Sequence, residues 1–275
     1  MTIRKIVVPV HGTRSDEPCL RTAGAAAARL SARIEAVFTR HDPREALPFA
    51  TGYVARDLEE RFATALAERD TAAHAKAEAL IGALRDDPKL AAVVFNSYPG
   101  PIEDAVMRRA RCADLVVASP YRSDEPAGRR RAREAALFDS GRPVLIAPPE
   151  TDGTVGARCV VAWDGSAVAA RAIASALPFL KQAEAVTLLV IDAEEPVRDT
   201  EEIAAYLDLH GAEAQILRVP VEQSIGRTLV GQSAAVSADL LVMGAYGHTW
   251  LRQQILGGTT RSVMLDTPIA VLMAH

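Results

Sequence analysis

The chain has few cysteines, and it has no long apolar run. Its three cysteines, Cys19, Cys112 and Cys159, form no CxxC pair, which argues against a disulfide framework or a zinc finger. No apolar run approaches the roughly 20 residues that a membrane span needs. The first residues enter a strand directly, without the layout of a signal peptide. We therefore expect a reduced, soluble, cytoplasmic protein without a metal site.

The charge balance also lacks a basic excess. Lysine and arginine number 31 against 35 acidic residues, for a net charge of −4, whereas a nucleic-acid binder usually shows a basic domain. Hydrophobic residues make up 49% and charged residues 24% of the chain, proportions typical of a globular protein and not of a disordered one. A length of 275 residues allows one large or two modest domains.

The two halves of the sequence repeat each other. Three segments recur in the same order: residues 5–13 match 158–166, residues 113–121 match 238–246, and residues 137–147 match 264–274. The segment between the copies, PPETDGTVGA, is rich in Pro, Gly, Asp and Thr and is typical of a linker. The repeat predicts two domains, 1–148 and 157–275, with about 28 additional residues in the first.

Each copy alternates short apolar runs with helical patterns. We expect strands at residues 3–10, 34–38, 91–95, 115–118 and 143–147, and again at 159–163, 185–191, 214–219, 240–243 and 269–273. The helices of the second copy are expected at 167–181, 200–209, 225–237 and about 255–266, and one long helix within 41–86 accounts for the additional residues of the first. Such alternation predicts an α/β fold of two tandem Rossmann-like domains, each a five-stranded parallel sheet flanked by helices. Ligands bind such sheets beyond the carboxyl ends of the strands, where the strand order reverses.

A glycine-rich segment follows the fourth strand of the second copy. Gly244 and Gly247 permit tight turns with positive φ, and Gly257 and Gly258 open the last helix ahead of Thr259 and Thr260. Free backbone N–H groups at a helix start suit a phosphate. No lysine is present, so this is not the GxxxxGK[ST] loop. The alternative is that the glycines only shape a corner between strand and helix.

The spacing G-x2-G-x9-G resembles the nucleotide signature of the universal stress proteins. The opening strand with its acidic turn, VVAWDGS at 160–166, and the closing PIAVLMAH extend the resemblance, and the repeat extends it to nearly the whole chain. It implies a tandem universal stress protein. Members of that family with the glycine pattern bind ATP, and others do not. In the family the closing strands pair between subunits, so we expect the copies to pair within this chain. Further dimerisation stays open.

The resemblance assigns a role to each matching residue. Asp164 would contact the adenosine, although Asp-Gly-Ser is also ordinary turn chemistry, and Ile191 would line the adenine pocket beside Met243. The phosphates, with or without Mg²⁺, would lie against Gly244, Gly247, Gly257, Gly258, Thr259 and Thr260. His248 flanks this loop and could donate to a phosphate oxygen, or it is a plain loop residue. Two departures stand out: Gly258 replaces the usual Ser or Thr, and the bulky Trp163 precedes Asp164.

The first copy has lost this signature. His11 stands opposite Asp164, Ser119 stands opposite Gly244, and residues 129–133 read RRRAR where the second copy has LGGTT. The arginines would form an anion clamp or contact an acidic partner, or they are a solvated face balanced by neighbouring acids. We expect them to face solvent, an acidic surface or an anion, and not to bind a nucleotide.

No pattern of catalytic residues accompanies the glycine loop. HExxH and GxSxG are both absent from the sequence. The leading expectation is therefore a cytoplasmic stress-response or signalling module that binds ATP in its C-terminal domain, with slow hydrolysis at most. The alternatives are a structural or interaction protein that binds no nucleotide, and an adenine-nucleotide hydrolase on a related fold.

Overall fold

The structure is a computed structural model of the 275-residue chain. It describes residues 2–40, 56–89, 93–122, 124–151, 153–192, 197, 199–245, 263–265 and 267–275, and of residues 56–59 it describes the backbone alone. Among these residues, no helix is both long and apolar enough to cross a membrane.

The described strands form one ten-stranded sheet in the order β3-β2-β1-β4-β5-β10-β9-β6-β7-β8. The strands of the first half are β1 (Lys5–Pro9), β2 (Arg33–Arg40), β3 (Val93–Pro99), β4 (Leu115–Ala118) and β5 (Val144–Ile146). Those of the second half are β6 (Arg158–Trp163), β7 (Ala185–Asp192), β8 (Ala214–Pro220), β9 (Leu240–Gly244) and β10 (Ala270–Ala274). Within each half all neighbours are parallel. Both halves thus repeat one strand order, third-second-first-fourth-fifth.

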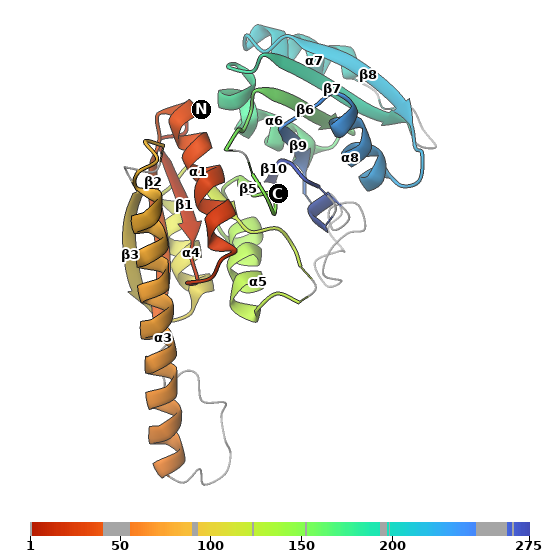
Figure 1. The fold of residues 1–275 in the computed structure, drawn as a ribbon. Helices are drawn as coiled ribbons and strands as arrows, with labels where there is room; N and C mark the ends of the chain where they lie inside the picture. The colour runs from red at the N-terminus through yellow and green to blue at the C-terminus, as the bar shows by residue number, and fades with distance from the viewer. Residues whose placement is uncertain are drawn as a thin grey trace.

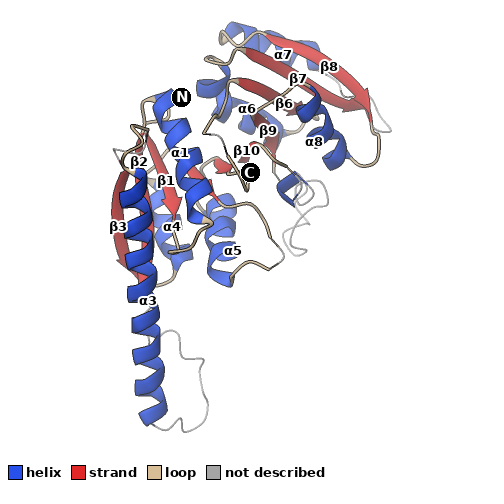
Figure 2. Ribbon diagram, in the orientation of Figure 1, coloured by secondary structure: helices blue, strands red, loops and turns tan. Residues whose placement is uncertain are grey.

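Helices cover both faces of this sheet (Figure 2). One buried cluster joins the sheet to α1 (Asp16–Leu30), α3 (Arg56–Leu84), α6 (Ala167–Leu180) and α7 (Thr200–Leu209). The second cluster joins the opposite face to α4 (Ile102–Arg111), α5 (Ala127–Glu134), the π-helical turn η1 (Ala135–Asp139) and α8 (Ile225–Ala235). Strands that are buried on both faces read as continuous apolar runs, which explains why their positions could be predicted.

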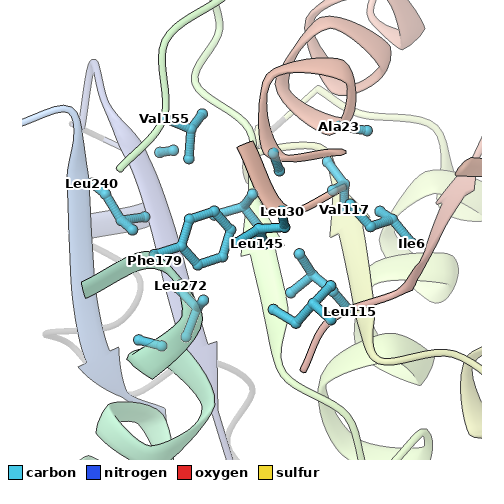
Figure 3. Packing of buried hydrophobic residues seen from close by; sticks show 14 of the residues in the cluster. Ile6, Ala23, Leu30, Leu115, Val117, Leu145, Val155, Phe179, Leu240 and Leu272 are labelled. Carbon is cyan, nitrogen blue, oxygen red and sulfur yellow. The ribbon is translucent and has the colours of Figure 1, made fainter. Parts of the chain in front are cut away.

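The two halves join edge to edge through their closing strands. β10 runs antiparallel to β5, and Leu272 is paired with Leu145. Phe179 of α6 is fully buried at this junction beside residues of both halves (Figure 3). The expected pairing of the copies within one chain is confirmed, and the result is one continuous sheet with two shared cores.

The additional residues of the first half include α3, a single helix of 29 residues as expected. Its C-terminal part buries Ala77, Ile81 and Leu84 against the sheet, whereas Phe62 is 40% exposed. The helix extends well beyond the sheet (Figure 1). It also crosses close to the turn after β1, where a Cβ on Gly12 would lie 2.1 Å from the carbonyl oxygen of Ala73.

Candidate functional site

The candidate site lies where the strand order of the second half reverses, between β6 and β9. Val161 of β6 is paired with Val242 of β9, so Asp164 and Gly244 follow at the carboxyl ends of adjacent strands. On the other side of β6, Trp163 is paired with Val190, which places Ile191 at the next strand end. The fold therefore brings three of the predicted residues to one edge, at the position where open parallel sheets bind ligands.

Gly244 allows the first turn of α6 to approach β9 closely. A Cβ at this position would lie 2.7 Å from the backbone nitrogen of Ala169 and 2.7 Å from Cγ2 of Val168. Gly244 does not have a positive φ, so the expectation that it serves a left-handed turn is wrong. Glycine is needed here because the space that a Cβ would take is already occupied by Val168 and by the backbone of Ala169.

Asp164 is exposed and forms the turn that leads into α6. Its Oδ1 accepts a hydrogen bond from the backbone N–H of Ser166 at 3.0 Å, and Gly165 between them has φ of +75°. Ser166 in turn caps the helix, because its Oγ accepts from the N–H of Ala169 at 3.2 Å. Asp164 therefore forms the turn that its Asp-Gly-Ser sequence suggested, and the turn holds its carboxylate at the carboxyl edge of the sheet.

The apolar candidates lie on the opposite face from α6. Met243 is 5% exposed within the second buried cluster, and Ile191 is half-buried against the same cluster. The side chain of Trp163 belongs to the first cluster and is 9% exposed. Because it packs on the α6 side of the sheet, its ring lies in the core and not on the face of Met243 and Ile191.

The other candidates fall outside the described residues. They are Gly247, His248, Gly257, Gly258, Thr259 and Thr260, and the expected helix at 255–266 is described only at residues 263–265. Within the described ranges, no group of three or more His, Cys, Asp or Glu side chains could hold a metal ion.

The corresponding edge of the first half is filled by arginine side chains. Arg129, 5% exposed, donates from Nη2 to Oδ1 of Asp16 at 3.0 Å and also to Oγ1 of Thr13. The Oδ2 atom of Asp16 accepts from the backbone N–H groups of His11 at 3.0 Å and Thr13 at 2.9 Å. Burial raises the pKa of Asp16, but the contacts with His11, Arg129 and Thr13 outweigh it, and the net pKa is lowered.

Arg133 makes a second buried ion pair. It is 2% exposed, and both of its Nη atoms donate to the carboxylate of Glu125, at 2.7 Å for Nη1. Nη1 also donates to the carbonyl oxygen of Pro120 at 3.1 Å. The expectation that all four arginines face solvent, an acidic surface or an anion is therefore wrong for Arg129 and Arg133. Both are neutralised inside the chain.

The other two arginines, Arg130 and Arg131, agree with the prediction of a solvated face that neighbouring acids balance. Arg130 lies 3.9 Å from Glu134, and Arg131 lies 3.1 Å from Glu103. Both side chains are about half exposed, at 50% and 49%. Such surface pairs contribute little to stability.

Very little space is left at the filled edge of the first half. The cavity there measures about 10 Å³, room for about one water molecule, and it is lined by Pro9, His11, Cys19, Ala118, Ser119, Arg129, Ala132 and Arg133. Burial raises the pKa of the Cys19 thiol to about 12, so the thiol stays protonated and unreactive. The cavity that the described residues enclose at this edge is too small for a nucleotide.

A contact between the halves was not predicted from the sequence. The N–H of Ala245, the residue after Gly244, donates to the carbonyl oxygen of Ala274 at 2.9 Å. Nδ1 of His275 lies 3.2 Å from the carbonyl oxygen of Ala245, and the ring of His275 meets Phe138 of η1 edge-on, with centroids 5.4 Å apart. The repeat between residues 137–147 and 264–274 could have indicated this contact, because these segments contain β5 and β10, the strands at which the two halves join.

Comparison with known proteins finds a family model that matches the second half. The model of the Universal stress protein family matches residues 157–275. A universal stress protein from Archaeoglobus fulgidus DSM 4304 is 16% identical, with a TM-score of 0.72 over 99% of this chain and 96% of that one. A functionally unknown protein from Pseudomonas aeruginosa PAO1 is 17% identical, with a TM-score of 0.57 over 99% and 92%. No curated protein matches the chain in sequence. The comparisons thus support one universal stress protein domain, at residues 157–275, in a chain whose whole fold is that of a solved universal stress protein.

Proposed function

We propose that the chain is a cytoplasmic tandem universal stress protein that binds ATP in its C-terminal domain, as a stress-response or signalling module. The domains are residues 1–148 and 157–275. The site consists of Asp164, Ile191, Met243 and Gly244 together with the loop residues Gly247, His248, Gly257, Gly258, Thr259 and Thr260.

The observation that carries this proposal is the close approach of β9 to α6 at Gly244. It places the start of the glycine-rich loop beside the N-terminus of a 14-residue helix, where the helix dipole favours an anion. Asp164 lies at the adjacent strand end, and a carboxylate there accepts hydrogen bonds from a ribose or an adenine amino group. Ile191 supplies an apolar surface on the next strand. These groups suit an adenine nucleotide, and any Mg²⁺ would accompany the phosphates.

The N-terminal domain has a different role in this proposal. Arg129 and Arg133 fill the edge that corresponds to the candidate site of the second half, and Asp16 and Glu125 neutralise them. We therefore expect one nucleotide per chain. The first domain would serve packing, regulation or contact with a partner.

Calorimetric titration with ATP and Mg²⁺ tests the proposal. We expect one site per chain and, with ATP at 10–100 times its dissociation constant, about 1.4–2.7 kcal/mol of stabilisation, hence a melting temperature several degrees higher at roughly 2–4 °C per kcal/mol. Gly257→Val should abolish the effect, because its branched side chain would enter the phosphate path.

Asp164→Asn provides a sharper variant. Its amide oxygen still accepts from the N–H of Ser166, so the turn is retained, but the negative charge is lost. Affinity for ATP should fall about tenfold or more, the value of a hydrogen bond to a charged group. Asp208→Asn on the exposed side of α7 is the control and should bind normally. Absence of binding to the wild-type chain would instead support the alternative of an interaction protein that binds no nucleotide.

A further inference from the structure

The loop of the candidate site begins at Ala245, whose backbone N–H and carbonyl oxygen both contact the C-terminal end of the chain. Ala245 is fully buried, its N–H donates to Ala274, and its carbonyl oxygen lies 3.2 Å from Nδ1 of His275. When Nδ1 carries the proton, the imidazole donates to this oxygen. The ring of His275 thus lies in direct contact with the residue at which the loop begins.

The ring of His275 is in turn placed by the first half. Phe138 meets it edge-on, with an interplanar angle of 85° and centroids 5.4 Å apart. Phe138 is also packed against the buried cluster that contains Met243, Ala245 and Met273. Aromatic rings prefer this edge-to-face arrangement, which favours the observed orientation of both rings.

The corresponding contact is not repeated on the other side of the junction. In the repeat, Leu265 stands opposite Phe138, and Pro148 stands opposite His275. Leu265 is 43% exposed, whereas Phe138 packs on the core. The aromatic contact thus belongs only to the edge that carries the candidate site.

Phe138 stands at the end of a helical segment that starts at the filled edge of the first half. α5 continues directly into η1, and Arg129 in its first turn is bonded to Asp16 and Thr13 beyond β1. Nine residues later, about 14 Å along a helix, Phe138 precedes β5. Because β10 is antiparallel to β5, the amino end of β5 lies beside the carboxyl end of β10. The segment therefore connects the filled edge of the first half with the edge that carries the candidate site.

We propose that Phe138 of the first half is a positioning residue for Ala245, the residue at which the candidate nucleotide loop begins, and that it acts through His275. The inference that nucleotide affinity depends on it rests on the proposed function. The expected effect of Phe138 on Ala245 is independent of the proposed function. A π-helical turn at this point agrees with such a role, since these turns are frequent at functional sites.

Hydrogen exchange and ATP titration of the full chain test this inference together. Phe138→Ala and His275→Ala should each speed exchange of the Ala245 amide about twofold to tenfold and weaken ATP binding by a similar factor, the range for one aromatic contact. The double variant should show little more than either single change, because the two rings act as one unit. Phe138→Leu replaces Phe138→Ala if the alanine variant folds poorly. It should show the same two changes, faster exchange at Ala245 and weaker ATP binding, to a smaller extent. Phe62→Ala on the exposed part of α3 is the matched control and should change neither value.

The outcomes separate the inference from the proposed function. Faster exchange at Ala245 in a chain that binds no ATP supports the positioning role and refutes only the ligand. Wild-type exchange at Ala245 in both single variants overturns the inference, whether or not ATP binds. Additive effects of the two substitutions would overturn the route through His275.

Discussion

At the scale of single residues, Glu35 is a buried carboxylate held by four side chains. It is 4% exposed on β2 and accepts two hydrogen bonds from Arg109, both at 3.0 Å, together with bonds from Tyr98 and Asn96. Nζ of Lys5 lies 2.7 Å from Oε2. Burial raises the pKa of Glu35, but the hydrogen bonds from Arg109, Lys5, Tyr98 and Asn96 outweigh this effect and lower the pKa to about 2.

This shift predicts a loss of stability in acid. Because the folded-state pKa is below the unfolded value, Glu35 stabilises the fold above pH about 4.5, and the contribution is lost as the pH falls toward about 2. Thermal melts between pH 2 and 7 should show a steeper loss for the wild type than for Glu35→Gln. At pH 7, Glu35→Gln should cost about 1–3 kcal/mol. Parallel pH profiles of the two chains would contradict the assignment.

Gly244 provides a second test at this scale. Gly244→Ala should destabilise the chain by about 1–3 kcal/mol, because the added methyl group would overlap the first turn of α6. Gly231→Ala is the control: it lies inside α8, and a Cβ there meets nothing within 4 Å. That substitution should be neutral or stabilise by about 0.4–1 kcal/mol. Urea unfolding of both variants measures the difference, and equal effects would show that β9 and α6 are not in close contact.

At the scale of elements, the ion pair between α1 and α5 is expected to be strongly stabilising in context. Arg129→Ala leaves Asp16 buried without its guanidinium partner, which should cost about 3–5 kcal/mol. Arg130→Ala removes a neighbouring arginine whose side chain is 50% exposed, and it should change stability by no more than about 0.5 kcal/mol. Denaturant melts compare the two. A small loss for Arg129→Ala would mean that Asp16 is solvated.

Elements whose signal is local were predicted well. The strand at 115–118 and the helix at 200–209 agree with β4 and α7 to the residue, because each is a short apolar or periodic run between turn signals. Arg129 and Arg133 were misjudged because burial is not a local property. The partner of Arg129 lies 113 residues away in Asp16, so a run of charges looks the same whether it is solvated or paired. For Glu35, the acid inside the apolar run IEAVF was a usable signal.

At the scale of the whole molecule, the shared cores predict cooperative unfolding. Since one buried cluster includes Leu145 of the first half and Leu272 of the second, neither half can lose its packing alone. Calorimetry should show one transition, and far-UV circular dichroism should coincide with tryptophan fluorescence. Phe179→Ala should destabilise the chain by about 3–5 kcal/mol and keep a single transition. Two resolved transitions in the wild type would mean that the junction is weak.

The pairing of β5 with β10 inside a single chain has a genetic consequence. Two identical chains that paired in this way would carry the same residue at the carboxyl edge of both sheets, so every mutation would alter both edges at once. In this chain the residues at the two edges are encoded separately, because both copies lie in one sequence. An arginine can replace a glycine at one edge while the other keeps its original sequence, and selection can act on the two edges separately.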